Sequence, residues 1–164
     1  DARRKKLEMV MKVGQRIEVV TEAVDRIQRA RRSVDLVLDQ LRDRKDDTAK
    51  DLRKSGADLK NVLTKVSEAF IEPEGRQGLF RNEDNASARL GAVLRSLGST
   101  FDAPTDAQSS YFRQAEAILE AALKEFNKAF RQDVAAFKQK VQAANVSLVP
   151  ESEALDVNWK RKLE

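Results

Sequence analysis

The chain has 164 residues, a net charge of +4, and neither His nor Cys. Their absence excludes a Ser-His-Asp triad, a Cys nucleophile, a His-bearing zinc site, a Glu-x-x-His di-iron site and a disulfide framework. Charged residues make up 35% of the chain and Gly and Pro are few, a composition typical of long helices. No apolar run approaches the roughly 20 residues that a membrane span needs. We therefore predict an all-α fold without a membrane span.

Apolar residues recur at steps of three and four along the first 41 residues, as in the a/d seam of a long packed helix. The seam comprises Val10, Val13, Ile17, Val20, Val24, Ile27, Val34, Leu38 and Leu41. It predicts a helix over residues 4–45, roughly 60 Å long at ~1.5 Å per residue. Many seam residues are β-branched, which lowers helix propensity, so this helix depends on its partner helices.

Arg31 occupies the one seam position that is not apolar. A cation there either pairs with a buried acid and fixes the helix register, or lays its stem along the core with its head in water. We favour the second interpretation. The first predicts that Arg31→Leu loosens pairing specificity.

Positive charge is concentrated in this predicted helix, since residues 1–45 carry a net charge of +5 and the rest of the chain −1. The excess lies in two clusters of candidate surface contacts. The first is Arg3, Arg4, Lys5 and Lys6, and the second is Arg29 and Arg32, with Arg31 between them. Such a stripe would attract nucleic acid or an anionic lipid surface. Because acidic residues interleave there and aromatic residues are missing, we favour a solvated helix face and do not expect nucleic acid as a partner.

A polar stretch over residues 43–48 predicts a turn, followed by a second helix over residues 48–71. Its seam is Leu52, Leu59, Leu63, Val66 and Phe70, with Gly56 at one seam position. Gly in a helix costs roughly 1 kcal/mol relative to Ala, which we attribute to a close helix approach or a local kink. Pro73 and Gly75 end the helix.

Residues 72–84 are predicted to form a charged loop. Leu79 and Phe80 within it are expected to hold the loop against the bundle. A short helix over residues 85–97 follows. Its inward positions are predicted to be Leu90, Val93, Leu94 and Leu97.

The last long helix begins at a capping box formed by Thr105 and Gln108, after Pro104. Its apolar positions are Phe112, Ala115, Leu119, Ala122, Leu123, Phe126, Phe130, Val134, Phe137 and Val141. It is predicted to end near Ala144 and Asn145, where Asn suits a left-handed cap.

Beyond this helix, Leu155, Trp159 and Leu163 are spaced by four, which suggests a short amphipathic helix. We expect Trp159 to be buried against the end of the bundle. The predicted organisation is thus a bundle domain over residues 1–149 and a tail over residues 150–164. The bundle is of the up-down type with coiled-coil-like packing, and contains two long helices, a medium one and a short one.

Carboxylate pairs at helical spacing, Glu116 with Glu120 and Glu18 with Glu22, are the candidates for general acid–base chemistry. Lys and Arg flank them and they lie off the apolar face, so we interpret them as solvated surface and keep a glycan-acting enzyme as a remote alternative. The chain has no phosphate-binding loop or EF-hand loop. We expect no catalytic residue, no metal and no cofactor.

Two stretches resemble a known family. The first is Met9-x-x-x-Val13-x-x-Arg16-Ile17-x-x-Val20-Thr21-x-Ala23-Val24-x-x-Ile27-x-x-x-Arg31, and the second combines Pro104-Thr105, residues 111–123 and Asp133-Val134-x-x-Phe137. Together they resemble the C-terminal helical region of large bacterial proteins with BNR/sortilin-like β-propeller repeats, often labelled glycosyl hydrolase-like. The resemblance spans residues 4–149.

The resemblance implies a non-catalytic structural or interaction module that packs on, or spaces, the upstream β-propeller domains of an exported polypeptide. Any hydrolase activity of that family belongs to the propellers, and no catalytic residue is carried over to this chain. The chain begins at Asp1 rather than Met, and we expect it to be part of a longer protein in the periplasm, at the outer membrane or outside the cell. A homo-oligomer stays open, because the first seam is able to close within the chain or on a second copy.

Overall fold

A computed structural model describes residues 1–73, 84–99 and 102–146. Its elements are α1 (Ala2–Gln40), α2 (Asp47–Glu68), α3 (Ala86–Gly98), α4 (Asp106–Ala129), the π-helical turn η1 (Phe130–Val134) and α5 (Ala135–Ala143). The described residues contain no strand, so the all-α prediction is confirmed. Within the same ranges, no helix has the length and apolar character required to cross a bilayer.

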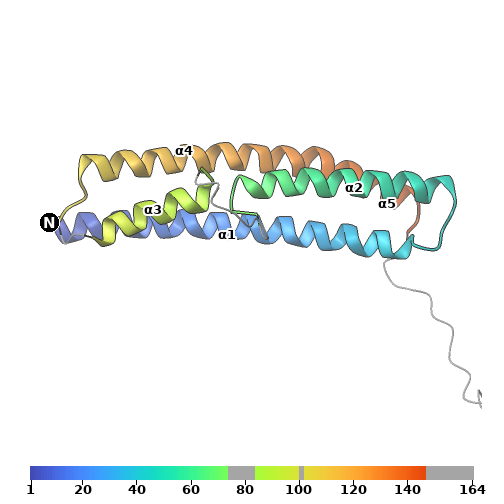
Figure 1. Ribbon diagram of the computed structural model, residues 1–164, viewed down its shortest axis with the longest axis horizontal. Helices are drawn as coiled ribbons and strands as arrows, with labels where there is room; N and C mark the ends of the chain where they lie inside the picture. The colour runs from blue at the N-terminus through green and yellow to red at the C-terminus, as the bar shows by residue number, and fades with distance from the viewer. Residues whose placement is uncertain (74–83, 100–101, 147–164) are drawn as a thin grey trace, which may run out of the picture.

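The helices form three rods that lie side by side (Figure 1). α1 is the first rod, α4, η1 and α5 form the second, and α2 and α3 lie end to end as the third. The two long rods run in the same direction and the α2–α3 rod runs against them. Arg16 of α1 pairs with Glu116 of α4 at 2.9 Å, so these two positions lie side by side in the two long rods. The predicted bundle is therefore an up-down-up arrangement in chain order, in which the rod that runs down is divided into α2 and α3.

The third rod is continuous in hydrogen bonding although its chain is interrupted. The amides of Ala86 and Ser87, at the start of α3, donate to the carbonyl oxygens of Ala69 and Phe70 at the end of α2, both at 3.0 Å. Helix ends otherwise leave such groups unpaired, and here the negative end of one helix dipole meets the positive end of the next. The predicted contacts of Leu79 and Phe80 lie outside the described residues.

α1 ends at Gln40, before the predicted end at residue 45. The end is fixed from α2, because the guanidinium of Arg53 donates to the carbonyl oxygen of Leu41 at 2.7 Å and also to that of Arg44. A cation at this position satisfies carbonyl groups that the helix itself leaves free.

Asp46 begins α2 by accepting a hydrogen bond from the amide of Ala49 at 3.0 Å. Arg44 donates to the same carboxylate at 3.0 Å. The Arg44 hydrogen bond, followed by that of Ala49, lowers the pKa of Asp46 below its ordinary value.

The buried face of α1 differs from the predicted seam at every second position. The residues spaced by seven are each at most 4% exposed, and they are Val13, Val20, Ile27, Val34 and Leu41. Between them Ala23 and Val37 are buried, whereas the predicted Val24 and Leu38 are half-buried. α1 packs against two rods, so its apolar face is wider than that of a coiled coil. The shift by one residue also removes Arg31 from the core, and it lies half-buried at a surface pocket that Glu68 also lines.

Gly56 permits the close approach of α1 and α2. A Cβ at this position would lie 2.9 Å from Cδ2 of Leu38 and 3.2 Å from Cγ1 of Val34. Of the two explanations for this glycine, close approach is confirmed. The predicted seam of α2 is also confirmed, since all of its members are buried: Leu52, Leu59, Leu63, Val66 and Phe70.

One side chain joins α3 to α4. Gln108 accepts a hydrogen bond from the amide of Thr105 at 3.0 Å, and Thr105 Oγ1 accepts from the amide of Gln108 at 3.2 Å, which confirms the predicted capping box. Gln108 also donates to the carbonyl oxygen of Ser96 in α3 at 2.9 Å. Leu94, predicted to face inward, is 38% exposed because α3 buries the neighbouring stripe of Leu90, Val93 and Leu97.

The π-helical turn η1 has a cause in the sequence. Apolar positions of α4 step by three and four as far as Phe126, and then by four twice, through Phe130 to Val134. An α-helix of about 3.6 residues per turn drifts away from such a spacing, and a π-type turn absorbs the extra residue. The rings of Phe126 and Phe130 stack there with centroids 4.2 Å apart. Phe137 consequently faces the interior again and is 8% exposed.

Candidate functional site

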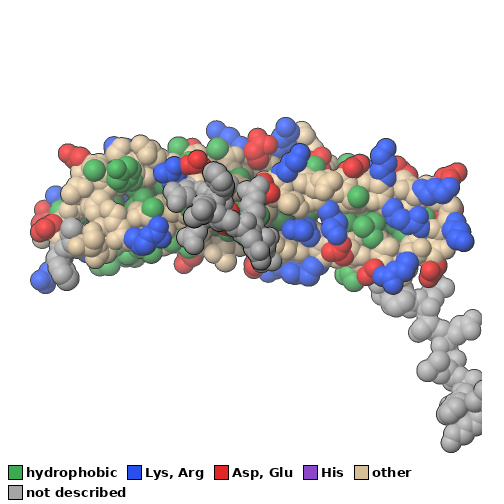
Figure 2. Space-filling model, viewed as in Figure 1, with side chains coloured by type: hydrophobic (Ala, Val, Ile, Leu, Met, Phe, Trp, Pro, Cys, Tyr) green, Lys and Arg blue, Asp and Glu red, His purple; other side chains and the backbone are tan. Residues whose placement is uncertain are grey.

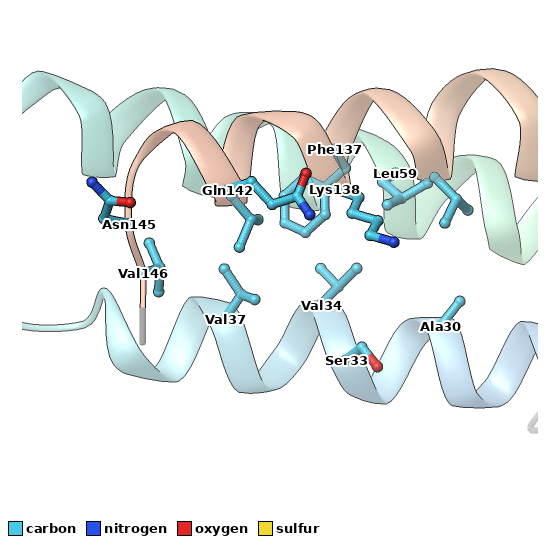
Figure 3. Close-up of a pocket in the computed structure, with 12 residues that line it drawn as sticks. Ala30, Ser33, Val34, Val37, Leu59, Phe137, Lys138, Gln142, Asn145 and Val146 are labelled. Carbon is cyan, nitrogen blue, oxygen red and sulfur yellow. The ribbon is translucent and has the colours of Figure 1, made fainter. Parts of the chain in front are cut away.

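An apolar groove lies between α1 and α5 (Figure 3), with a volume of about 550 Å³. α1 forms one wall, η1 and α5 form the other, and Leu59 of α2 contributes between them. The residues that line it are Ala30, Ser33, Val34, Val37, Leu59, Val134, Phe137, Lys138, Val141, Gln142, Asn145 and Val146. Most of these side chains are apolar, which makes the groove suited to an apolar surface.

Small residues on α1 and the turn in the second rod together keep this groove open. Ala30 and Ser33 stand on the α1 wall, where larger side chains would reach across to α5. The hydroxyl of Ser33 donates to the carbonyl oxygen of Arg29 at 3.1 Å, so it needs no partner from an occupant. η1 sets the direction in which Phe137 and Val141 point, and α5 packs against α2 beyond it.

The polar residues of the groove are Ser33, Lys138, Gln142 and Asn145, all of which are exposed. Lys138 is the one ionisable residue among the described residues that line it. The arrangement offers apolar walls with a polar rim, which is the composition of a surface that receives a helix or a strand of apolar side chains.

A second apolar feature lies at the end of the bundle where α1 begins, α3 ends and α4 begins (Figure 1). It consists of Leu7, Met11, Leu94 and Tyr111, which are 59%, 57%, 38% and 57% exposed. They are distributed over α1, α3 and α4 at this end, and we refer to the four residues together as the apolar end surface. Leu36, 57% exposed, stands apart from them in the last turns of α1.

The predicted basic contacts do not form one surface. Arg3 and Arg29 are 26 residues apart on the same straight helix, a separation of roughly 39 Å at ~1.5 Å per residue. Several of these cations have acidic neighbours one turn away: Arg4 with Glu8 at 3.0 Å, Lys5 with Asp1 at 3.4 Å and Arg29 with Asp25 at 3.7 Å. Figure 2 shows Lys and Arg interspersed with Asp and Glu along the visible face.

The carboxylate pairs lie apart from the groove. Glu116 is engaged by Arg16 and Glu22 by Arg26, while Glu18 and Glu120 are exposed. Among the described residues, no three acidic side chains are grouped in a way that would hold a metal ion.

The groove itself was not predicted from the sequence. The seam analysis placed Val34, Phe137 and Val141 on inward faces, and all three line the groove. Two signals for it were present, namely the small Ala30 next to the seam position of Arg31, and the repeated four-residue step that produces η1.

Comparisons with known proteins find no family model, no curated protein and no solved structure that matches this chain. The resemblance of residues 4–149 to the helical region of β-propeller proteins therefore stays a prediction.

Proposed function

We propose that this chain is a non-catalytic interaction module, the C-terminal helical domain of a larger exported protein whose β-propeller domains precede it. The sequence resemblance motivates the parent protein, and the apolar end surface carries the proposal. Leu7, Met11 and Tyr111 are each more than half exposed. Leu7 and Met11 are four residues apart and so share one face of α1, and adjacent exposed apolar side chains of this kind mark interaction sites.

The apolar end surface lies where a preceding domain would join the bundle. Leu7 and Met11 lie within the first three turns of α1, so a domain joined to Asp1 would be next to them. α1 has 39 residues and is roughly 58 Å long, so a bundle held at this end would extend away from the propellers as a rigid spacer. Any hydrolase activity would belong to the propellers, and the bundle would supply contact and position.

The first test is the mass of the native polypeptide that contains these residues, recovered from fractionated source cells. A mass several times the 18.5 kDa of this chain, in the envelope or secreted fraction, would support the proposal. A mass near 18.5 kDa in the cytosol would refute it.

The second test addresses the end surface in the parent protein. Leu7→Ser with Met11→Ser is expected to expose the interdomain junction to protease, with roughly tenfold faster cleavage for each 1.4 kcal/mol by which the interface between the domains is weakened. Leu36→Ser is the matched control, because Leu36 is equally exposed but lies near the other end of α1. Equal cleavage rates in both variants would contradict the proposed interface.

A further inference from the structure

The cap of α5 places an apolar side chain at one end of the groove between α1 and α5. α5 ends in a Schellman motif, in which the amide of Asn145 donates to Gln142 O at 3.1 Å and the amide of Val146 to Val141 O at 3.5 Å. Asn145 has a φ of 47°, which confirms the predicted left-handed cap. Figure 3 shows the chain turning from α5 toward α1 at this motif, with Val146 between the two helices. The groove therefore has two apolar walls and an apolar end.

The charge of the groove is positive and comes from one side chain. Of the described residues that line it, Lys138 is the only cation and none is acidic. Lys140, two residues further along, pairs with Asp51 at 2.9 Å, whereas the amine of Lys138 has no hydrogen bond or ion pair within the described part of the chain. Figure 3 shows the Lys138 side chain extending from α5 toward α1. A cation without a partner beside apolar walls suits a ligand with an anionic head and an apolar body.

The dimensions of the groove suit an alkyl chain. Its volume of about 550 Å³ lies within the ~300–1,000 Å³ typical of small-molecule sites. Its α1 wall, from Ala30 to Val37, is roughly 11 Å long, and an extended decanoate chain has a similar length. Phe137 and Val141 form the facing wall, and the Ser33 hydroxyl is already bonded within α1. An alkyl chain would remove these walls from water without leaving a donor or acceptor unpaired.

We propose that the groove binds a medium-chain fatty acid, whose carboxylate pairs with the amine of Lys138 and whose alkyl chain runs between α1 and α5 toward Val146. The apolar end surface lies at the opposite end of the bundle (Figure 1), so this site is separate from the proposed domain contact. The predicted helix with Leu155, Trp159 and Leu163 lies outside the described residues and has no part in the proposal.

Isothermal titration calorimetry of this chain with three probes tests the head group and the alkyl chain separately. Decanoate, decanol and decyltrimethylammonium carry the same alkyl chain on an anionic, a neutral and a cationic head. Below the concentrations at which micelles form, we expect decanoate to bind most tightly and decyltrimethylammonium most weakly. Each methylene removed between decanoate and octanoate should weaken binding by up to about fourfold, the factor that corresponds to about 0.8 kcal/mol per buried CH₂.

Lys138→Gln tests the head group. It is expected to weaken decanoate binding by about two- to fivefold, as for the loss of an exposed ion pair, and to leave decanol binding unchanged. Lys124→Gln is the matched control, because Lys124 is exposed on α4 in the same rod and does not line the groove. This control should leave the affinity for all three probes unchanged.

Ser33→Phe tests the alkyl chain, because Ser33 is exposed on the groove wall and the change keeps the net charge. The added ring is expected to weaken binding of all three probes by about tenfold or more, a factor that the loss of two buried methylenes suffices to produce. Thr21→Phe is the control, since Thr21 is exposed on the same helix and its hydroxyl likewise donates to a carbonyl oxygen four residues earlier. Far-ultraviolet circular dichroism verifies the helical content of both variants.

Three results would overturn the proposal. The first is the absence of saturable decanoate binding by the unaltered chain. The second is equal affinity for the three head groups, which would assign the groove to an apolar segment of a partner protein. The third is an equal loss in Ser33→Phe and Thr21→Phe, which would place the bound decanoate elsewhere. The experiment uses this chain alone, so its outcome does not depend on the existence of a parent protein.

Discussion

Gln108 performs two structural tasks that the substitution Gln108→Glu separates. The side chain is 7% exposed. Its oxygen accepts from the amide of Thr105 at 3.0 Å, and its nitrogen donates to the carbonyl oxygen of Ser96 at 2.9 Å and to Ser96 Oγ at 3.2 Å. Glutamate keeps the acceptor of the capping box and replaces the donor with a second acceptor.

The two tasks predict opposite signs for the change in the free energy of unfolding. For the capping box alone, a carboxylate in the first turn of α4 is stabilising by about 0.3–1 kcal/mol. For the tie to α3, the Ser96 carbonyl loses a nearly buried partner and faces a negative oxygen, which costs about 1–3 kcal/mol. The second effect is larger, so Gln108→Glu is expected to destabilise the bundle by about 1–2 kcal/mol near neutral pH.

Urea unfolding followed by circular dichroism measures this difference. Thr105→Ala is the control for the cap alone, with an expected loss of about 1 kcal/mol. At about pH 4 the introduced carboxylate is partly protonated and regains a donor, so the deficit of Gln108→Glu should shrink there. A variant as stable as the original chain near neutral pH would refute the tie between α3 and α4.

Three further predictions concern the first two helices. Gly56→Leu is expected to destabilise the fold by about 1–3 kcal/mol, since a Cβ alone would lie 2.9 Å from Leu38 Cδ2. Urea unfolding measures this loss of stability. If adding Leu38→Ala to the variant restored no stability, the steric reason would be contradicted. Arg44 lowers the pKa of Asp46 in the folded chain below its ordinary value of 3.8. The ionised carboxylate therefore stabilises the fold fully at a pH above 3.8, and this stabilisation is lost as the pH falls through the lowered pKa. Asp46→Asn should therefore reduce the change in urea midpoint between about pH 5 and about pH 3. A monomeric peptide of residues 4–45 should be weakly helical by circular dichroism, and a strongly helical spectrum would show that its β-branched seam does not need partner helices.

Features that depend on neighbouring residues alone were predictable from the sequence. The capping box of Thr105 and Gln108 and the left-handed cap at Asn145 follow from local hydrogen bonding and backbone sterics. Every predicted seam residue of α2 is buried, because these apolar residues share one face of the helix.

Features that depend on where the rods meet were not predictable. Along α1, an apolar residue stands both three and four positions after Val20 and after Val34. Only the positions of α2, α3 and α4 decide that Ala23 and Val37 are buried while Val24 and Leu38 are half-buried. Arg31 had the sequence position of a core residue for the same reason. Nothing local indicated that Ala69 and Phe70 would accept hydrogen bonds from the start of α3.

The candidate surfaces divide along the same line. Leu7 and Met11 were absent from the predicted seam, so their exposure follows from the helical period of α1, although the end they share with Leu94 and Tyr111 comes from the fold. The basic clusters were read correctly as residues of one helix, and the length of that helix keeps them apart.

Amino-acid sequence by itself determined the helical class, the caps at Thr105 and Asn145 and the apolar face of α2, because these depend on backbone hydrogen bonds and on the period of a single helix. Tertiary structure alone decided that α2 and α3 form one rod, that the two long rods run in the same direction, and that a groove stays open between α1 and α5. An apolar face can be satisfied by any neighbour of suitable shape, so its partner is chosen by the packing of the whole chain.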